Sequence, residues 1–101
     1  MIIYNITLKI HESIKNEWLV WAQEVHIPEV MGTGYFSQSK LLRLLEIDDN
    51  EGPTYAIQFT AESKAIYNAY IEKHAQEMRQ RSFDKWGDKF IAFRSLMQIV
   101  D

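Results

Sequence analysis

The sequence of 101 residues contains no cysteine. Disulfide bonds, thiolate catalysis and zinc or iron–sulfur sites with cysteine ligands are therefore excluded. The formal net charge is −3, which does not provide the broad cationic surface that nucleic acids bind. No apolar run is long enough to span a membrane, and the first residues lack the basic and apolar segments of a secretion signal. We therefore expect a cytoplasmic protein that binds neither nucleic acid nor membrane.

What the sequence does contain is apolar side chains. Hydrophobic residues make up 47% of the chain and aromatic residues 13%, which is too rich a composition for a disordered chain. A chain of this length can bury a real core without covalent cross-links. We expect one domain over residues 1–101.

Four segments have the character of β-strands. The first alternates apolar and polar residues with a period of two, which is typical of a half-buried strand. The second has leucines on both parities around Arg43, which predicts that both of its faces are covered. The dense turn signal Asp48–Pro53 joins the second and third strands into an antiparallel hairpin. The predicted strands are Ile2–Ile10, Ser37–Asp48, Thr54–Ala61 and Lys89–Val100.

Two helices are predicted between these strands. The first follows a junction at which His11 or Ser13 can cap it, and it carries an apolar stripe from Ile14 to Val25. It should end near His26, because the residue before a proline avoids helical dihedral angles and residue 28 is Pro28. The second helix opens with Thr60–Ser63 and has its stripe from Ile66 to Met78. Residues 82–87 are interpreted as an aromatic turn or a short helix.

The resulting order, β-α-β-β-α-β, is the ferredoxin-like α+β plan with a four-stranded antiparallel sheet. Two helices can cover only one face of such a sheet. The covered face cannot hide all of the apolar residues Leu41 or Leu42, Leu45, Phe90 and Leu96, so an apolar uncovered face is expected. An exposed apolar face of this size marks an interaction surface. We predict a homodimer in which two sheets pack face to face as a dimeric α+β barrel.

Several segments carry a resemblance to known proteins. They are Met1–Thr7, Trp18-x-x-Trp21, His26–Val30, Thr33–Phe36, Thr54–Phe59 and Gly87–Arg94. The chain resembles the dimeric α+β barrel superfamily, which includes antibiotic-biosynthesis and haem-degrading monooxygenases and muconolactone-isomerase-like proteins. More closely, it is similar to a family of short bacterial proteins catalogued as a domain of unknown function. The resemblance implies the barrel fold and a dimer, and it implies no particular reaction.

The haem-degrading members offer a sharper comparison. They resemble this chain in having an asparagine on the first strand and a histidine on the second helix, where Asn5 and His74 fall here. They also have a tryptophan near the start of the second helix, and this sequence has Tyr67 in that region. That departure argues against haem chemistry.

Two histidines are candidate catalytic residues. His26 is either a cap at a helix C-terminus, where the dipole favours an imidazolium, or a general base or ligand at the mouth of a crevice. His74 is either a core residue hydrogen-bonded to a tyrosine or carbonyl, or a base or axial ligand that faces a pocket. No pair with the spacing HxH or HxxxH occurs, so we expect no metal site.

Further candidates line the predicted interior. Each strand contributes one polar residue, and these would converge inside the barrel if the registers align. They would form either a polar lumen for an anionic or carbonyl-bearing small molecule, or a hydrogen-bond network that spans the dimer. Aromatic residues either line the crevice or belong to the core. The polar set is Asn5, Arg43, Gln58 and Arg94, and the aromatic candidates include Trp18, Trp21 and Tyr67.

Two functions are consistent with these patterns. The first is a small-molecule-binding homodimer, of the cofactorless monooxygenase or isomerase type, with a hollow of a few hundred cubic ångströms and a histidine on its wall. The second is a non-catalytic accessory or assembly module, which predicts packed helices and fully hydrogen-bonded histidines. The sequence indicates no cofactor, and it identifies neither the substrate nor the reaction.

Overall fold

Four strands form one antiparallel sheet in the computed structural model, which describes residues 1–101. The order across the sheet is β2-β3-β1-β4, so the first and third strands occupy the centre. The predictions for the first and third strands are confirmed, and the last strand is shorter at both ends. The strands are β1 (Ile2–Ile10), β2 (Gln38–Arg43), β3 (Thr54–Ala61) and β4 (Phe90–Gln98).

The second strand is shorter than the sequence pattern predicts. It ends at Arg43, and Leu44 adds one more hydrogen bond from its N–H to the Thr54 carbonyl at 3.0 Å. Glu46 then has a φ of 59°, a left-handed conformation that a strand does not accommodate. Leu42 is 41% exposed and Leu45 is 76% exposed. The prediction that both faces of this segment are covered is therefore wrong for the single subunit.

Two interrupted helices connect the strands. The first helix consists of η1 (Glu12–Ile14), α1 (Lys15–Trp21), η2 (Ala22–His26) and α2 (Ile27–Gly32). The second helix consists of α3 (Lys64–Tyr70), η3 (Ile71–Ala75) and α4 (Gln76–Trp86). Both η2 and η3 are π-helical turns, so each helix widens near its middle.

Each helix begins at a side-chain cap, and the cap at His11 confirms the prediction for the first helix. The Nδ1 atom of His11 accepts a hydrogen bond from the Ser13 N–H at 3.1 Å. The hydroxyl of Ser63 accepts one from the Ile66 N–H at 3.2 Å. Each side chain satisfies one of the backbone donors that the first turn of a helix leaves free.

The helix ends differ from the predictions in both cases. The first helix continues through His26, because Pro28 lies in the first turn of α2, where a residue without an N–H is tolerated. Because the π-helical turn η2 comes directly before it, α2 can start at this proline without a break in the helix. Residues 82–87 are not a separate turn, because α4 runs on to Trp86 and ends at Gly87, whose φ is 59°.

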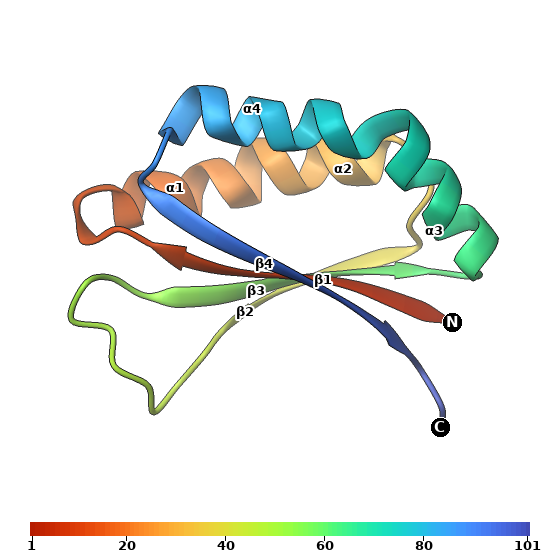
Figure 1. Ribbon diagram of the computed structural model, residues 1–101, viewed down its shortest axis with the longest axis horizontal. Helices are drawn as coiled ribbons and strands as arrows, with labels where there is room; N and C mark the ends of the chain where they lie inside the picture. Colours follow the sequence, from red (N-terminus) through yellow and green to blue (C-terminus); the bar gives the residue numbers. More distant parts are fainter.

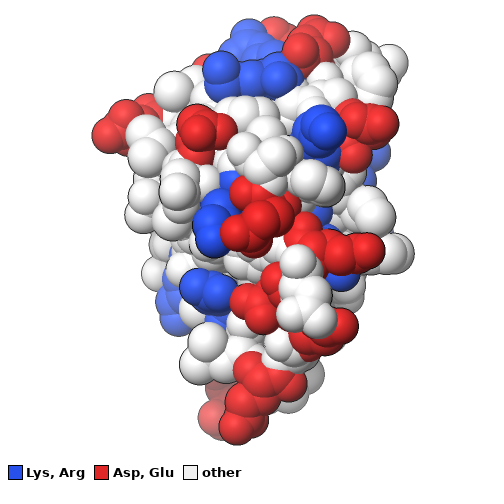
Figure 2. Space-filling model, turned by 90° about the vertical axis from the view of Figure 1, so that its left-hand side faces the viewer, with Lys and Arg blue, Asp and Glu red and all other residues white.

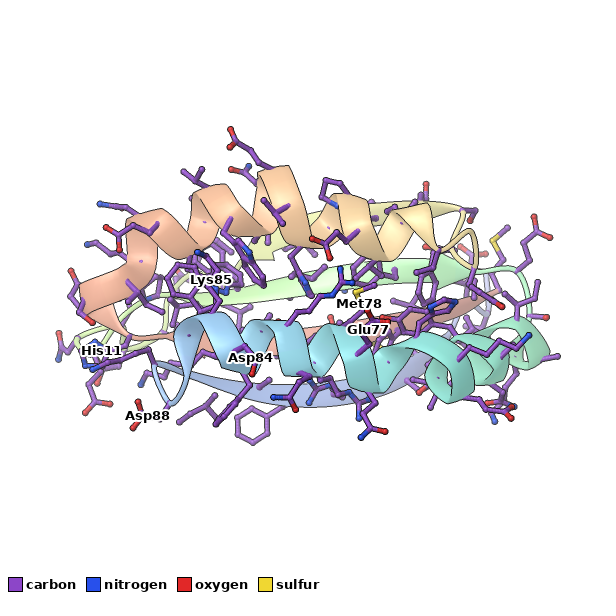
Figure 3. All side chains as sticks on the ribbon, turned by 90° about the horizontal axis from the view of Figure 1, so that it is seen from above. His11, Glu77, Met78, Asp84, Lys85 and Asp88 are labelled. Atoms are coloured by element: carbon purple, nitrogen blue, oxygen red, sulfur yellow. The ribbon has the colours of Figure 1, made fainter.

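The two helices cover one face of the sheet, and the opposite face has no cover (Figure 1). Seen from above, the helices lie side by side over the strands, and Met78 is directed into the space between them (Figure 3). The core lies between helices and sheet, where alternate residues of β1 and β3 meet the buried Trp18, Val30 and Tyr70. No helix is both long and apolar enough to cross a membrane.

The strand register shows which residues lie on the uncovered face. Phe90 pairs with Ile10 and Leu96 pairs with Tyr4, both of which belong to the core under the helices. Phe90 and Leu96 therefore lie on the covered face, whereas Leu42 lies on the uncovered one, so the prediction that the helices cannot hide all of these residues is confirmed. The exposed apolar residues on the uncovered face are Leu42, Ile91, Phe93 and Met97, which we call the open-face residues.

The turn between β2 and β3 is acidic. In a view of that end of the molecule, Asp and Glu side chains gather at the lower tip (Figure 2). Some of them are tied back to the sheet, since Asp49 accepts from Arg43 at 2.8 Å and Glu51 pairs with Lys9 at 3.4 Å. Gly52 closes the turn with a φ of 135°, and its N–H donates to the Asp49 carbonyl at 3.0 Å.

Candidate functional site

A pocket lies between the sheet and the two helices. The cavity itself has a volume of about 40 Å³, and the space not filled by protein atoms reaches about 440 Å³ when the part open to solvent is counted. Ten of the fourteen lining residues are hydrophobic, and they come from β1, β3, β4 and both helices. The four polar residues of the lining, which we call the polar quartet, are His26, Arg79, Ser82 and Arg94.

His26 is the last residue of the π-helical turn η2. Its ring stacks on that of Trp21, with centroids 4.8 Å apart and an interplanar angle of 14°. Its Nδ1 atom is buried and has no hydrogen-bond partner. An unpaired buried nitrogen costs free energy in the empty protein, and a ligand that hydrogen-bonds to it recovers that cost.

The environment keeps this imidazole neutral. Burial lowers the pKa of His26 from 6.5 to about 4, while Glu29 opposes the shift and the charge of Arg81 adds to it. At neutral pH the ring therefore offers one donor and one acceptor. The prediction that His26 caps a helix C-terminus is wrong, because the helix continues to Gly32 and the ring lines the pocket.

Two arginines supply the positive charges of the pocket lining. Arg79 comes from α4 and donates from Nη2 to the hydroxyl of Tyr4 at 3.2 Å, and Arg94 comes from β4. Burial raises the pKa of Tyr70, and the charges of Arg79 and Arg94 act against that rise. Tyr70, which also lines the pocket, therefore stays neutral.

His74 occupies the π-helical turn η3 but does not line the pocket. Its ring lies 5.3 Å from that of Tyr35 and 6.1 Å from that of Tyr70, centroid to centroid. The ring makes no hydrogen bond within the chain, so the interpretation as a histidine bonded to a tyrosine or carbonyl is wrong. The structure does not bring His26 and His74 together in one site.

The four polar strand residues do not converge. Asn5 and Gln58 are register partners on the uncovered face, where Gln58 Nε2 donates to Asn5 Oδ1 at 3.3 Å. Arg94 is paired with Ile6 and therefore points to the helix side. Arg43 also lies on the helix side but is exposed and bound to Asp49. Of the four, only Arg94 reaches the pocket.

The aromatic candidates are divided between core and surface. Trp18 is fully buried and stacks on Tyr55 with centroids 5.3 Å apart. Trp21 packs edge-on against Trp86 and lines a shallow groove on the outside of the helices. Tyr67 packs against Tyr4 with ring centroids 5.4 Å apart. None of Trp18, Trp21 and Tyr67 lines the pocket.

Sequence reasoning missed two members of the polar quartet, Arg79 and Ser82. The signal that could have identified them is helical spacing. Arg79 lies four residues after Ala75, and Ser82 lies four after Met78, so both share the core-facing side of the second helix. No group of three or more His, Asp or Glu side chains that could hold a metal ion is present.

Comparison with known families and structures gives consistent results. The family model described as "Domain of unknown function (DUF4286)" matches residues 1–100. No curated protein matches the sequence. Several solved structures share the fold at low sequence identity, which demonstrates similarity of fold alone.

A dimeric ferredoxin-like protein from an uncultured marine organism superimposes with a TM-score of 0.74 at 10% identity, over 99% of this chain and 95% of the other. An EthD-family protein from Bacillus halodurans has a TM-score of 0.67 at 10% identity, over 98% of this chain and 100% of the other. A hydroxynitrile lyase from Passiflora edulis has a TM-score of 0.61 at 16% identity, over 99% of this chain and 96% of the other. The ferredoxin-like α+β fold is thus established.

Proposed function

We propose that this chain, which belongs to the DUF4286 family, is a homodimer in which each subunit binds one small apolar molecule between its sheet and its helices. The ligand carries a hydroxyl or carbonyl group that hydrogen-bonds to His26. The observation that carries the proposal is the buried, unpartnered Nδ1 atom of His26 in a pocket whose lining is otherwise mostly apolar. The cytoplasmic location expected from the sequence is retained as part of the proposal.

The alternative, a non-catalytic accessory module, predicts packed helices and fully hydrogen-bonded histidines. His26 has an unpaired buried nitrogen, and the pocket contains unfilled space. Since core histidines are normally hydrogen-bonded, these two features favour a ligand. The accessory-module alternative lacks a comparable supporting observation.

The reaction that best suits such a site is an isomerisation. A C–H bond beside a ligand carbonyl breaks, its proton passes to a nitrogen of His26, and the same proton returns to another atom of the ligand. No oxidant is needed, in contrast to a monooxygenase step. With a pKa of about 4, His26 is a weak base in the empty pocket, and negative charge developing on the ligand raises that pKa. Proton transfer is therefore favoured only when the pocket is occupied.

The dimer rests on the uncovered sheet face. Phe93 is 66% exposed and Ile91 is 56% exposed, and both lie on the face without helices. The polar residues between these apolar side chains bond to one another, since Asn5 Nδ2 donates to Thr7 Oγ1 at 3.0 Å and Asn5 Oδ1 accepts from Gln58. Because Asn5, Thr7 and Gln58 hydrogen-bond to one another, burying them against a second copy leaves few polar groups without a partner. The fold shared with a dimeric ferredoxin-like protein supports the same arrangement.

The experiment compares two histidines that occupy equivalent turns. Thermal unfolding is followed with phenol, quinone and small ketone ligands for the native protein, His26→Phe and His74→Phe. The phenylalanine at position 26 keeps a ring on Trp21 and removes the nitrogens. We expect at least one ligand to raise the melting temperature of the native protein and of His74→Phe, and to have a smaller effect on His26→Phe.

Equal ligand-induced shifts in both variants would contradict the role of His26. Absence of a shift for every ligand would leave the binding proposal without support. Because the melting temperature of each variant is measured without ligand as well, loss of folding is recognised separately.

A further inference from the structure

The chain contains four arginines, and only two of them are neutralised. Arg43 pairs with Asp49, and Arg81 pairs with both Glu29 and Glu77. Neither Arg79 nor Arg94 forms an ion pair, although the chain has fourteen acidic residues and a net charge of −3. Both residues are exposed in the subunit, so what distinguishes them is the surface that they line.

Both unpaired arginines line the same pocket, and its lining contains no Asp or Glu. Arg79 is held in place by its hydrogen bond to the hydroxyl of Tyr4 at 3.2 Å. Arg94 reaches the pocket from β4, the edge strand next to β1. Two cationic groups from two different elements therefore line a space whose other residues, apart from His26 and Ser82, are hydrophobic.

We infer that the ligand of this pocket is a small carboxylate with an apolar body, and that Arg79 and Arg94 bind its carboxylate. The inference deepens the proposed function and rests on it. A guanidinium group matches the two oxygens of a carboxylate, and a charge-assisted hydrogen bond is about twice as strong as a neutral one. The hydrocarbon part of the ligand lies against side chains such as Ile6, Leu8 and Met78.

A simpler explanation for the two arginines is that their charged ends are solvated and their stems cover apolar surface. On that explanation the charge of the ligand would not matter. Comparison of an acid with its amide of nearly equal shape therefore separates the two explanations. Inorganic phosphate has charge but no apolar body, so it tests whether the ligand needs an apolar body.

The experiment measures dissociation constants by NMR titration for two matched pairs, benzoate with benzamide and hexanoate with hexanamide. At least one acid is expected to bind the native protein about tenfold more tightly than its amide. Arg79→Gln and Arg94→Gln should each weaken binding of the acid by about tenfold and leave binding of the amide unchanged. Arg81→Gln is the control, since Arg81 is on the same helix but pairs with Glu29 and Glu77.

Equal binding of acid and amide would overturn the carboxylate inference while the pocket function stands, provided that His26→Phe weakens both. Failure of both pairs to bind would overturn the inference and the pocket function together. Inorganic phosphate that displaces the acid at equal concentration would overturn the requirement for an apolar body. Arg94→Lys keeps the charge, so its partial recovery of acid binding would support a role for charge rather than for folding.

Discussion

At the level of single residues, Gly52 is restricted by its surroundings as well as by its backbone. A Cβ atom built at this position would lie 1.8 Å from the carbonyl oxygen of Ile10, which belongs to the backbone and cannot rotate away. Gly34 also has a positive φ, 86°, but has open space around the corresponding position. The two glycines therefore separate steric overlap from conformational strain.

We predict that Gly52→Ala lowers the free energy of unfolding by about 3 kcal/mol or more, because the backbone must shift to remove the overlap. Gly34→Ala should lower the free energy of unfolding by only about 1 kcal/mol, because alanine must adopt a left-handed conformation there. Urea unfolding of both variants and the native protein measures the difference. Equal losses in the two variants would show that the Ile10 carbonyl imposes no such constraint.

The pH dependence of stability should reflect His26. Its pKa in the folded protein, about 4, is below the value of 6.5 expected when the chain unfolds. The unfolded chain therefore binds the proton more readily, and the free energy of unfolding falls as the pH drops from about 6.5 to about 4. The loss due to this group is at most about 3 kcal/mol, reduced by the partial exposure of the ring.

Urea unfolding of the native protein, His26→Phe and His74→Phe at pH 7, 5.5 and 4.5 tests this prediction. Protonation of carboxylates lowers the stability of all three proteins to a similar degree. The additional loss should be present in the native protein and in His74→Phe, and absent from His26→Phe. An identical loss in His26→Phe would show that burial does not perturb His26.

At the level of secondary structure, helix starts are encoded locally and can be tested individually. Ser63 accepts a hydrogen bond from the Ile66 N–H at the start of α3. We predict that Ser63→Ala lowers the free energy of unfolding by about 1 kcal/mol and that Ser63→Asp, which can also accept this bond, retains most of it. Thermal or urea unfolding measures both. An alanine variant as stable as the native protein would show that this cap contributes nothing.

The cap at His11 was predictable from the sequence because a cap depends on residues within one turn. The end of the first helix was not, because Pro28 normally marks a boundary and a π-helical turn just before it allows the helix to continue. Such a turn has no simple sequence signature. The prediction of β2 failed for a related reason, since the left-handed Glu46 ends the strand inside an apolar run.

The candidate site was predicted only in part, since the sequence alone does not fix the register between strands. Alternation along each strand is evident, but whether Arg94 shares a face with Asn5 depends on which residues pair. In the structure Arg94 is the register partner of Ile6, so its side chain lies on the helix side of the sheet. The side chain of Asn5 lies on the opposite side. His26 and Arg94 lie in one pocket because two elements far apart in sequence pack together, and no local pattern records that.

At the level of the whole molecule, the uncovered sheet face is the proposed interface of the homodimer. Two phenylalanines are exposed to a similar degree, Phe93 at 66% on that face and Phe83 at 59% on α4. If the face is a dimer interface, Phe93 is buried in the assembly and Phe83 is not. The two positions thus offer a matched test of where the second copy binds.

We predict a native mass in solution of about twice the 11.9 kDa of one chain. Phe93→Glu should convert the protein to a folded monomer, because two carboxylates would be buried between the sheets without partners. Phe83→Glu should leave the dimer unchanged, since α4 lies on the other side of the subunit. Sedimentation equilibrium gives the masses and circular dichroism confirms folding. A native monomer, or a dimer that survives Phe93→Glu, would show that the open face is not the interface. The pocket would then have to function within a single subunit.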